Sequence, residues 1–538
     1  MVVYGVDLGT TYSSLGYLDV TGRPAVIQTA DGTDAIPSVA YFASATEVVI
    51  GEEAKDTAVI QPDLVVDLIK RELGSNHSVA MHGDVFTPEE ISALILRRLV
   101  NDAEAFTRGS EALDEDDDGP TPAVIAVPAS FGTQQREATR IAGELAGLSV
   151  IDVISEPIAA AISYGVLDLD PADDQEQTIL IFDLGGGTFD ITVIAVRGNQ
   201  VEEICTGGDP ELGGVDWDDR LAEQLVEEFF AAHPGSSHPF DDAGTLHDIR
   251  HQVEDAKIRL SSEESQTVRI VHEGLVATIE LTRGEFETRT LDLLDRAIEI
   301  TRNALAAAAQ RGVPKVDEII LVGGSSRMPA VTDRLIAEFG LQPRLHEPEL
   351  AVAKGAARYG FDQIYHRMVA AGRVEDAQRL ARRTGLSPEQ EERLANQSLR
   401  PVVPRSVGIM CSDGEYDSVV HLIHGNDPLP AAATATLFTG ADNQTSLTVQ
   451  IVEQAGPTES PDPTANRLVA LGSVKLAPAM PAGTPVELTL SMTRGGLLRA
   501  EFNPEQGAQP HDFRLRVGNI SDADIPAVRD RLAVIKVR

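Results

Sequence analysis

Hydrophobic and polar positions change their spacing several times along this chain. Over residues 1–362, short apolar runs typical of buried strands alternate with segments of helical periodicity. Three of these runs, at residues 2–6, 179–182 and 319–322, are each followed within three residues by a glycine. The alternation of strands with helices predicts an α/β domain.

Residues 363–402 have a different character, because they are polar and their periodicity is helical. A second helix in this segment should begin at Ser387. Serine suits the N-cap position, Pro388 suits the first helical position, and Gln390 suits the third, where its side chain can complete a capping box. This pattern predicts a helical polar linker.

Residues 403–518 are predicted to form a β domain. Short apolar stretches are divided there by turn residues, and strict alternation of apolar and polar positions is clearest at 447–452 and 486–490. Residues 519–538 predict one short helix. Its apolar face would carry Val528, Leu532 and Ile535.

Two predicted strands end in nearly the same motif, Asp-Leu-Gly-Thr-Thr at residues 7–11 and Asp-Leu-Gly-Gly-Gly-Thr at 183–188. Glycine turns let backbone N–H groups approach an anion, and the carboxylates of Asp7 and Asp183 could hold a hydrated Mg²⁺. Two such loops predict two related half-domains that close on one nucleotide. A third glycine bend at 323–329 supports this interpretation.

Composition narrows the possible partners and location. The chain has 538 residues, a formal net charge of −40 and two cysteines far apart in sequence. This length requires two or more domains, and the acidic balance argues against a nucleic-acid backbone or an anionic membrane surface as the main partner. No apolar run reaches transmembrane length and no signal peptide is recognisable, so we expect a cytoplasmic protein without disulfides.

The chain resembles the 70-kDa heat-shock chaperone family of the DnaK type, within the actin-like ATPase superfamily. The resemblance covers about the first 360 residues in unbroken order. It is carried by the motifs at 5–11, 69–71, 127–131, 156–161, 183–190, 212–216, 256–262 and 323–329. It implies an α/β actin-like ATPase with ribonuclease-H-like duplicated halves, followed by a β-sandwich domain.

The resemblance also implies roles for individual residues around ATP or ADP and Mg²⁺. Asp7 and Asp183 would hold Mg²⁺ mostly through water, and Asp190 would hold K⁺ or a water near the phosphates. Lys70 would contact the γ-phosphate and orient the attacking water. Glu156 would hold a metal-bound water. The implied catalytic residues are Lys70, Glu156, Asp183 and Thr188, and the implied metal residues are Asp7, Asp183 and Asp190.

The remaining nucleotide contacts fall into four groups. The first loop would offer Gly9, Thr10 and Thr11 to the phosphates, and the second loop would offer the amides of Gly185, Gly186, Gly187 and Thr188. Three residues on one helix face, Glu254, Lys257 and Ser261, would hold the ribose and adenine, because their spacing of three, four and seven aligns them. The opposite side would be closed by Gly324, Ser325 and Arg327.

The C-terminal third resembles the family's peptide-binding domain more weakly. Four residues, Ile409, Phe438, Leu447 and Val449, would either line a pocket for an apolar peptide side chain or form the core of the sandwich. Pro128 and Arg136 resemble the family's relay between its two domains. The family's leucine-rich interdomain linker is not recognisable, and the segment 519–538 has no room for the family's helical lid, so we expect a lidless variant that releases peptide quickly.

Three functional hypotheses follow from these observations. The first is an ATP-hydrolysing, chaperone-like protein that couples nucleotide state to an extended peptide or unfolded client. The second is a nucleotide-gated binding module for one dedicated protein partner. The third is a small-molecule kinase, which would have no use for a β-sandwich. The resemblance adds a J-domain cochaperone and a nucleotide exchange factor as expected partners.

Overall fold

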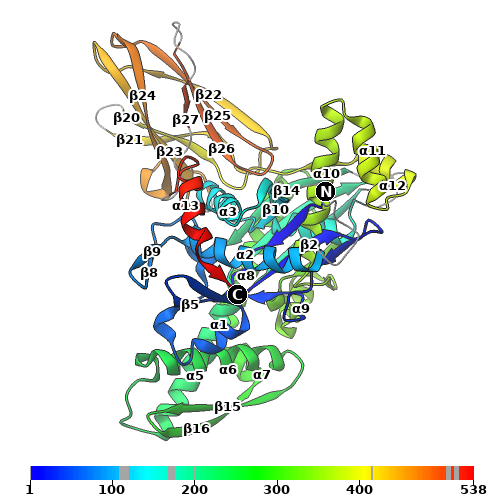
Figure 1. The fold of residues 1–538 in the computed structure, drawn as a ribbon, viewed down its shortest axis with the longest axis vertical. Coiled ribbons are helices and arrows are strands. Elements are labelled where there is room, and N and C mark those ends of the chain that lie inside the picture. The colour runs from blue at the N-terminus through cyan, green and yellow to red at the C-terminus, as the bar shows by residue number, and fades with distance from the viewer. Residues whose placement is uncertain are drawn as a thin grey trace.

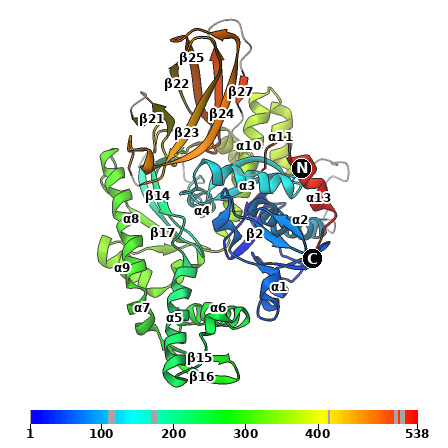
Figure 2. The same cartoon turned by 90° about the vertical axis from the view of Figure 1, so that its left-hand side faces the viewer.

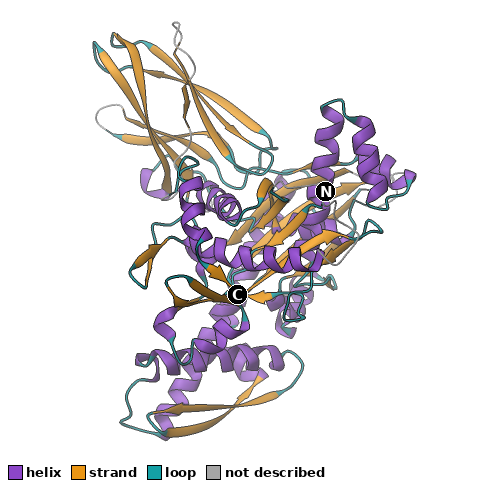
Figure 3. Ribbon diagram, in the orientation of Figure 1, coloured by secondary structure: helices purple, strands orange, loops and turns teal. Residues whose placement is uncertain are grey.

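The computed structural model describes residues 2–107, 120–167, 176–198, 200–412, 416–456, 458–504, 511–513 and 520–538. Figure 1 shows a two-lobed α/β unit with a β-sandwich above it. Figure 3 shows that most helices belong to the α/β unit, whereas the sandwich is almost entirely strand. This arrangement confirms the predicted fold class.

The first half of the α/β unit is built on a mixed sheet with strand order β11-β10-β1-β2-β3, in which β4 also pairs with β2. Strands β1, β10 and β11 are parallel, and β2 and β3 run antiparallel to their neighbours. The bounds are β1 (Tyr4–Asp7), β2 (Tyr12–Leu18), β3 (Pro24–Val26), β4 (Ile36–Pro37), β10 (Pro122–Val127) and β11 (Ser149–Ser155).

The second half repeats this plan on a sheet of order β18-β17-β12-β13-β14-β19. Here β12 is parallel to β17 and antiparallel to β13, as β1 is to β10 and β2. The duplication predicted from the two glycine motifs is therefore present in the topology. The bounds are β12 (Gln177–Leu184), β13 (Phe189–Arg197), β14 (Gln200–Asp209), β17 (Glu318–Val322), β18 (Arg344–Leu345) and β19 (Ser398–Arg400).

Helices cover the two sheets and extend the lobes. In Figure 2 the helices α5 and α6 and the hairpin β15–β16 form the end of the molecule opposite the sandwich. The helices of the first half are α1 (Glu52–Thr57), α2 (Pro88–Thr107), α3 (Thr133–Leu145) and α4 (Glu156–Tyr164). The elements of the second half are α5 (Gly214–Ala232), α6 (Ala243–Leu260), β15 (Ser265–His272), β16 (Leu275–Thr282), α7 (Arg283–Arg289), α8 (Leu291–Gln310) and α9 (Pro329–Phe339).

Helix α10 (Ala351–Ala370) fastens the first half together by unusually close backbone contacts. A Cβ on Gly5 would lie 2.0 Å from the amide nitrogen of Ala357, and a Cβ on Gly355 would lie 1.7 Å from the carbonyl oxygen of Ala159. Only glycine permits these approaches. A buried cluster that includes Ala159, Ile181 and Ala356 then joins α4 and α10 to the second sheet.

Two short helices, α11 (Val374–Arg383) and α12 (Pro388–Asn396), follow α10 and share a small core with its C-terminal half. The predicted capping box is present: Gln390 N–H donates to Ser387 Oγ at 3.2 Å, and Ser387 N–H donates to Gln390 Oε1 at 2.8 Å. After α12 the chain adds β19 to the edge of the second sheet, parallel to β14. Sequence reasoning missed this strand, because three residues are too few to show a period.

The sandwich consists of two antiparallel sheets of orders β21-β20-β23-β24 and β22-β25-β26-β27. Its core includes Ile409, Ile451, Leu488 and Phe502. The bounds are β20 (Val407–Ser412), β21 (Asp417–Ile423), β22 (Ala431–Phe438), β23 (Gln444–Gln454), β24 (Asn466–Met480), β25 (Pro485–Met492), β26 (Leu498–Pro504) and β27 (His511–Phe513).

The last described segment, residues 520–538, returns from the sandwich to the first half. Figure 1 shows α13 (Ile525–Ala533) beside α3 and α2. The Arg97 guanidinium donates to the Leu532 carbonyl at 2.7 Å, and Arg531 pairs with the buried Glu90. Strand β28 (Lys536–Val537) then joins β6 (Glu47–Ile50), β5 (Ala40–Ser44) and β7 (Val65–Val66) in a small sheet, and β8 (Val79–Met81) and β9 (Asp84–Phe86) form a separate hairpin.

The predicted division at residue 518 lies outside the described residues, and the other domain boundaries stay predictions. Among the residues that the structure describes, none of the helices combines the length and the apolar content that crossing a membrane requires.

Candidate nucleotide site

The two glycine loops face each other between the halves of the α/β unit. The first joins β1 to β2 and the second joins β12 to β13. They are in contact: a Cβ on Gly186 would lie 2.3 Å from Thr11 Oγ1, and a Cβ on Gly187 would lie 2.4 Å from Thr10 Oγ1. The duplicated topology thus brings Thr10 and Thr11 against the second loop, as the motifs predicted for one shared site.

The backbone of the second loop has a defined hydrogen-bond pattern. Gly185 N–H donates to the Thr188 carbonyl at 3.0 Å, which closes the turn. Gly214 N–H donates to the Gly185 carbonyl at 2.9 Å, and Val215 N–H donates to the Gly186 carbonyl at 2.8 Å. The Gly185 amide is therefore used inside the turn, which leaves the amides of Gly186, Gly187 and Thr188 as the better candidates for phosphate contacts.

A buried ion pair lies where the loops meet. Lys70 Nζ donates to Glu156 Oε1 at 2.6 Å, and both side chains are less than a tenth exposed. Lys70 comes from the short 3-10 helix Ile69–Glu72, and Glu156 is the first residue of α4. Burial by itself lowers the pKa of Lys70, but the charges of Glu156 and Asp7 outweigh burial and raise it, so the ammonium stays protonated.

The carboxylates around this pair repel one another. Burial, followed by the charge of Glu156, raises the pKa of Asp7 to about 7 and that of Asp190 to about 7. The same two causes raise the pKa of Asp183 well above its usual range. A bound cation would relieve such a cluster, because it compensates the buried negative charge that raises these pKa values.

The residues present fit a magnesium–nucleotide complex. Asp190 Oδ1 accepts the Ser130 N–H at 2.7 Å, whereas Asp190 Oδ2 is buried and has no hydrogen-bond partner among the described residues. Among the described residues, no group of three or more His, Cys, Asp or Glu side chains is arranged to bind a metal ion. Mg²⁺ keeps several water ligands and is completed by phosphates, so Asp7 and Asp183 suit it without such a group.

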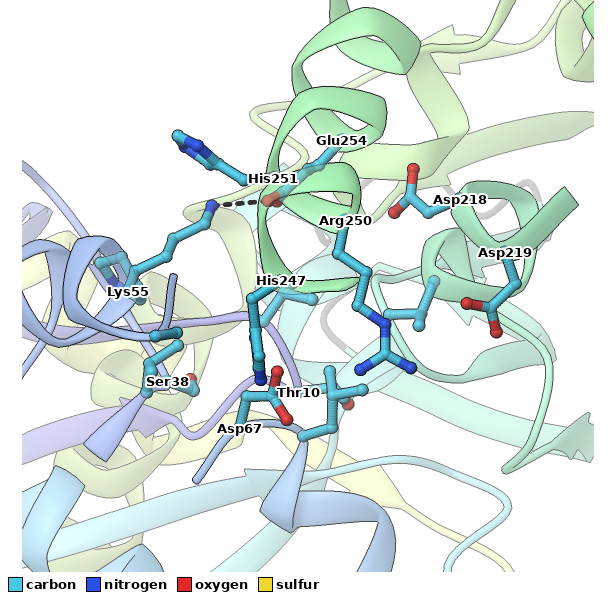
Figure 4. A pocket seen from close by; sticks show the side chains of 16 residues that line it. Thr10, Ser38, Lys55, Asp67, Asp218, Asp219, His247, Arg250, His251 and Glu254 are labelled. Atoms are coloured by element: carbon cyan, nitrogen blue, oxygen red, sulfur yellow. Dashed lines mark hydrogen bonds and ion pairs between the residues drawn. The ribbon is translucent and has the colours of Figure 1, made fainter. Parts of the chain in front are cut away.

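The cleft beside the loops is shown in Figure 4, where side chains of both halves line one pocket. Lys55 Nζ of α1 pairs with Glu254 of α6 at 2.5 Å across this cleft, and also donates to the Tyr12 hydroxyl at 3.2 Å. Glu254 therefore lies at the cleft, where it is engaged by a lysine that the sequence analysis did not identify. No local motif marks Lys55, because its partner is distant in sequence.

Lys257 lies further toward the C-terminal end of α6 than Glu254, and Ser261 is the residue that caps this end. Lys257 Nζ donates to the Gly214 carbonyl at 3.0 Å and pairs with Asp218 at 2.6 Å, so it fastens α6 to the start of α5. Ser261 Oγ donates to the Lys257 carbonyl at 3.3 Å. The three residues share a helix face, but Lys257 is committed to a structural contact with α5.

The third glycine bend comes close to the same place. The short helix Gly324–Arg327 brings Ser325 against α5, since a Cβ on Gly214 would meet Ser325 Oγ at 2.3 Å. Arg327 pairs with Glu349 at 2.5 Å and is half exposed. The structure therefore brings Ser325 and Lys257 close together beside Gly214, while Arg327 is engaged in a half-exposed pair with Glu349.

The sandwich contacts the α/β unit near Ser130 and Thr133, beside the carboxylate cluster. Glu453 of β23 is buried, and its Oε1 accepts the N–H and hydroxyl of Thr133, at the start of α3, at 2.7 and 2.8 Å. Arg405 Nε donates to the Ser130 carbonyl at 3.1 Å. Because Ser130 N–H also binds Asp190, a short chain of hydrogen bonds joins the sandwich to the carboxylate cluster.

Arg136, which sequence reasoning connected with interdomain communication, lies in this interface. Its guanidinium is buried and donates to the carbonyls of Phe131 and, in the sandwich, Gly495, at 2.9 and 3.2 Å. Glu203 is a further interface residue that the sequence did not reveal: its Oε2 accepts the Val402 N–H at 2.9 Å, just beyond β19.

The four residues proposed for a peptide pocket separate in the structure. Ile409 and Val449 are buried in the sandwich core, Leu447 packs against that core, and Phe438 is 62% exposed at the end of β22. Of the two alternatives, core packing describes Ile409 and Val449, and only Phe438 presents a large apolar surface.

Comparison with known proteins agrees with this fold. The profile of the Hsp70 protein family matches residues 3–82 and 76–361, which is well over half of the chain. The chaperone protein DnaK from each of two strains of Halobacterium salinarum is 34% identical over 540 residues, an alignment that covers 98% of this chain and 77% of the relative. The chain therefore belongs to the Hsp70 family.

Proposed function

We propose that this protein hydrolyses ATP and couples its nucleotide state to the binding of an extended peptide or unfolded client. Members of the family bind ATP or ADP with Mg²⁺, are ATPases, and generally bind peptide clients and cochaperones. The observation that carries the proposal is the buried Lys70–Glu156 pair at the meeting point of the two glycine loops.

The chain's own residues supply position and charge, which are what phosphoryl transfer requires. Bound Mg²⁺ would neutralise phosphate charge, with Asp7 and Asp183 holding its water ligands. The Lys70 ammonium, held in place and kept protonated by Glu156, would contact the γ-phosphate and orient the attacking water. Thr10, Thr11 and Thr188 would enclose the phosphates from both loops, and Asp190 Oδ2 would hold K⁺ or a water.

Coupling to the client is supported by the contacts of the sandwich with this site. Asp190 binds Ser130, and Ser130 binds Arg405 of the sandwich. A shift of Asp190 on binding or losing the γ-phosphate would move one end of this chain, and the sandwich lies at the other end. In this proposal residues 1–362 are the ATPase domain, 363–402 the helical linker, 403–518 the client-binding domain and 519–538 a C-terminal helix.

Single-turnover ATP hydrolysis, with and without an extended apolar peptide, tests the proposal. We expect the peptide to accelerate hydrolysis and Lys70→Ala to slow it by at least about 100-fold, because a preorganised charge at the phosphate is lost. Lys315→Ala is the matched control, since the Lys315 side chain is 79% exposed. Hydrolysis that Lys70→Ala leaves unchanged would contradict the proposed mechanism.

One observation favours the second function, a nucleotide-gated module for a dedicated partner. Residues 520–538 return to the first half and add β28 to its small sheet. The chain segments before and after the sandwich therefore both pack on the α/β unit. Such attachment would restrict the movement of the sandwich. Turnover that no peptide changes, together with partner binding that differs between ATP and ADP, would support this function. A J-domain cochaperone and an exchange factor stay predictions.

A further inference from the structure

Arg71, the neighbour of Lys70, reaches from the first half into the second glycine loop. Its Nε and Nη2 donate to the Gly187 carbonyl at 3.1 and 2.9 Å, and Nη2 also pairs with Asp216 Oδ2 at 2.7 Å. Its side chain is about one-fifth exposed. The planar guanidinium is the group that can serve a carbonyl and a carboxylate at once, because its donors form a rigid fork.

Arg71 completes a series of three held carbonyls. Gly185 and Gly186 present theirs to the N–H groups of Gly214 and Val215, at the start of α5 in the same half. Gly187, the third in the series, presents its carbonyl to Arg71 instead. The carbonyls of Gly185 and Gly186 are thus held by α5 of the same half, and the carbonyl of Gly187 is held by a residue of the other half.

The orientation of a carbonyl determines the orientation of the next amide. In a trans peptide the C=O and the following N–H point in opposite directions. The N–H groups of Gly186, Gly187 and Thr188 therefore point away from α5 and Arg71. The side of the loop opposite α5 and Arg71 is where an anionic ligand would meet these three donors.

Asp216 holds Arg71 in this position. It is the third residue of α5, and its Oδ2 accepts the Gly213 N–H at 2.7 Å in a capping arrangement. Gly213 in turn lies against Gly187, since a Cβ there would be 2.5 Å from the Gly187 carbonyl carbon. Arg71, Asp216 and Gly213 therefore lie around the Gly187–Thr188 peptide on the side of its carbonyl.

We propose that Arg71 is a positioning residue for ATP hydrolysis: it holds the Gly187 carbonyl so that the Thr188 N–H faces the γ-phosphate. Because Arg71 belongs to the other half, this amide reaches its working orientation only when the two halves close. The inference rests on the proposed ATPase function, and it adds a reason why hydrolysis should depend on closure.

Comparing ATP with ADP separates a positioning role from a merely structural one. We expect Arg71→Met to lower kcat about 30-fold and to weaken ATP binding about 10-fold, while ADP binding changes less than about 2-fold, since ADP lacks the γ-phosphate. Arg71→Lys should remain impaired, because a single ammonium cannot hold both acceptors. Added methylguanidinium should partly restore kcat in Arg71→Ala.

Arg220→Met is the matched control, because Arg220 lies on α5 and its side chain is 39% exposed in a surface pair with Asp292. Equal losses of ATP and ADP affinity, or a kcat that Arg71→Met leaves unchanged, would overturn the inference. Failure of the unmodified protein to hydrolyse ATP would instead overturn the proposed function. The difference between ATP and ADP binding would still test Arg71 in that case.

Discussion

The two glycine loops have nearly the same sequence, yet they are held in different ways. In the first loop the Gly9 carbonyl accepts the Ser38 hydroxyl at 2.8 Å, and the Thr11 carbonyl accepts the Ser38 N–H at 2.8 Å. In the second loop the carbonyls are held by α5 and by Arg71 of the opposite half. The first loop depends on a residue fewer than thirty positions away, and the second depends on a distant element.

This difference teaches that duplicated motifs need not have duplicated roles. The first loop can form wherever its own half is folded, because its partners lie within that half. The second loop reaches its full set of contacts only when the cleft is closed. We expect the first loop to behave as a rigid part of the fold and the second to report the relative position of the halves.

One glycine substitution in each loop, Gly9→Ala in the first and Gly187→Ala in the second, offers the strongest way to break this comparison. A Cβ on Gly9 would lie 1.9 Å from the carbonyl oxygen of Tyr12 in the same hairpin, so Gly9→Ala should destabilise the fold by about 3 kcal/mol. A Cβ on Gly187 would instead meet the Thr10 side chain across the cleft, so Gly187→Ala should weaken ATP binding roughly 100-fold with little loss of stability. Thermal unfolding and nucleotide titration measure the two effects.

Gly284→Ala serves as the control, because a Cβ at that glycine would meet nothing within 4 Å. If Gly187→Ala lowered stability as much as Gly9→Ala did, the second loop would be as much a part of its own half as the first loop is.

The sheet of the second half is completed by β19, which comes from the segment between α12 and the sandwich. The residues just after β19 lead to a prediction about pH. Burial raises the pKa of Glu203 to about 7, and the hydrogen bond from the Val402 N–H and the charge of Arg136 offset only part of this rise. A raised pKa means that docking is favoured below the pKa of the exposed carboxyl and weakens as pH rises through 7. Docking should therefore be about tenfold weaker at pH 8 than at pH 6.

The docking of the sandwich and the segment before it on β14 can be measured by energy transfer between two dyes. One dye is placed at an exposed position of the sandwich and the other at an exposed position of the α/β unit. Glu203→Gln should remove most of the pH dependence, because the amide cannot ionise. Glu202→Gln, at the exposed neighbouring position of β14, should retain it. A Glu203→Gln protein with the full pH dependence would assign the effect to another group.

The smallest effect expected concerns the hydroxyl that holds the first loop. Ser38→Ala removes the donor to Gly9 and the contact with Ser13, and it should lower the free energy of unfolding by about 1 kcal/mol. ATP turnover should change less than about 3-fold, because the Ser38 N–H to Thr11 remains. A loss of turnover as large as that of Arg71→Met would show that the first loop is no more independent than the second.

Much of the site was predictable because its signals are local. The strand–glycine–strand motifs predicted both loops and the duplication, and residues of the two loops are in contact between the halves. Lys70 and Glu156 were recognised from motifs, whereas Lys55, Arg71 and Glu203 gained their interest only from partners far away in sequence. The separation of Ile409 and Val449 from Phe438 was also invisible, because alternation marks a strand's two faces without saying which face is covered.

The sequence by itself determined the α/β character of the first 362 residues, the two glycine turns and the β character of the C-terminal region, because periodicity and turn chemistry act over a few residues. Only the tertiary structure decided which atoms complete the second loop, where β19 docks and how the sandwich contacts Ser130. Those outcomes depend on which hydrogen-bond partners the folded chain places beside each buried backbone N–H and C=O group. Every residue has a backbone carbonyl, so the sequence does not show that the Gly187 carbonyl is the one that the Arg71 guanidinium binds.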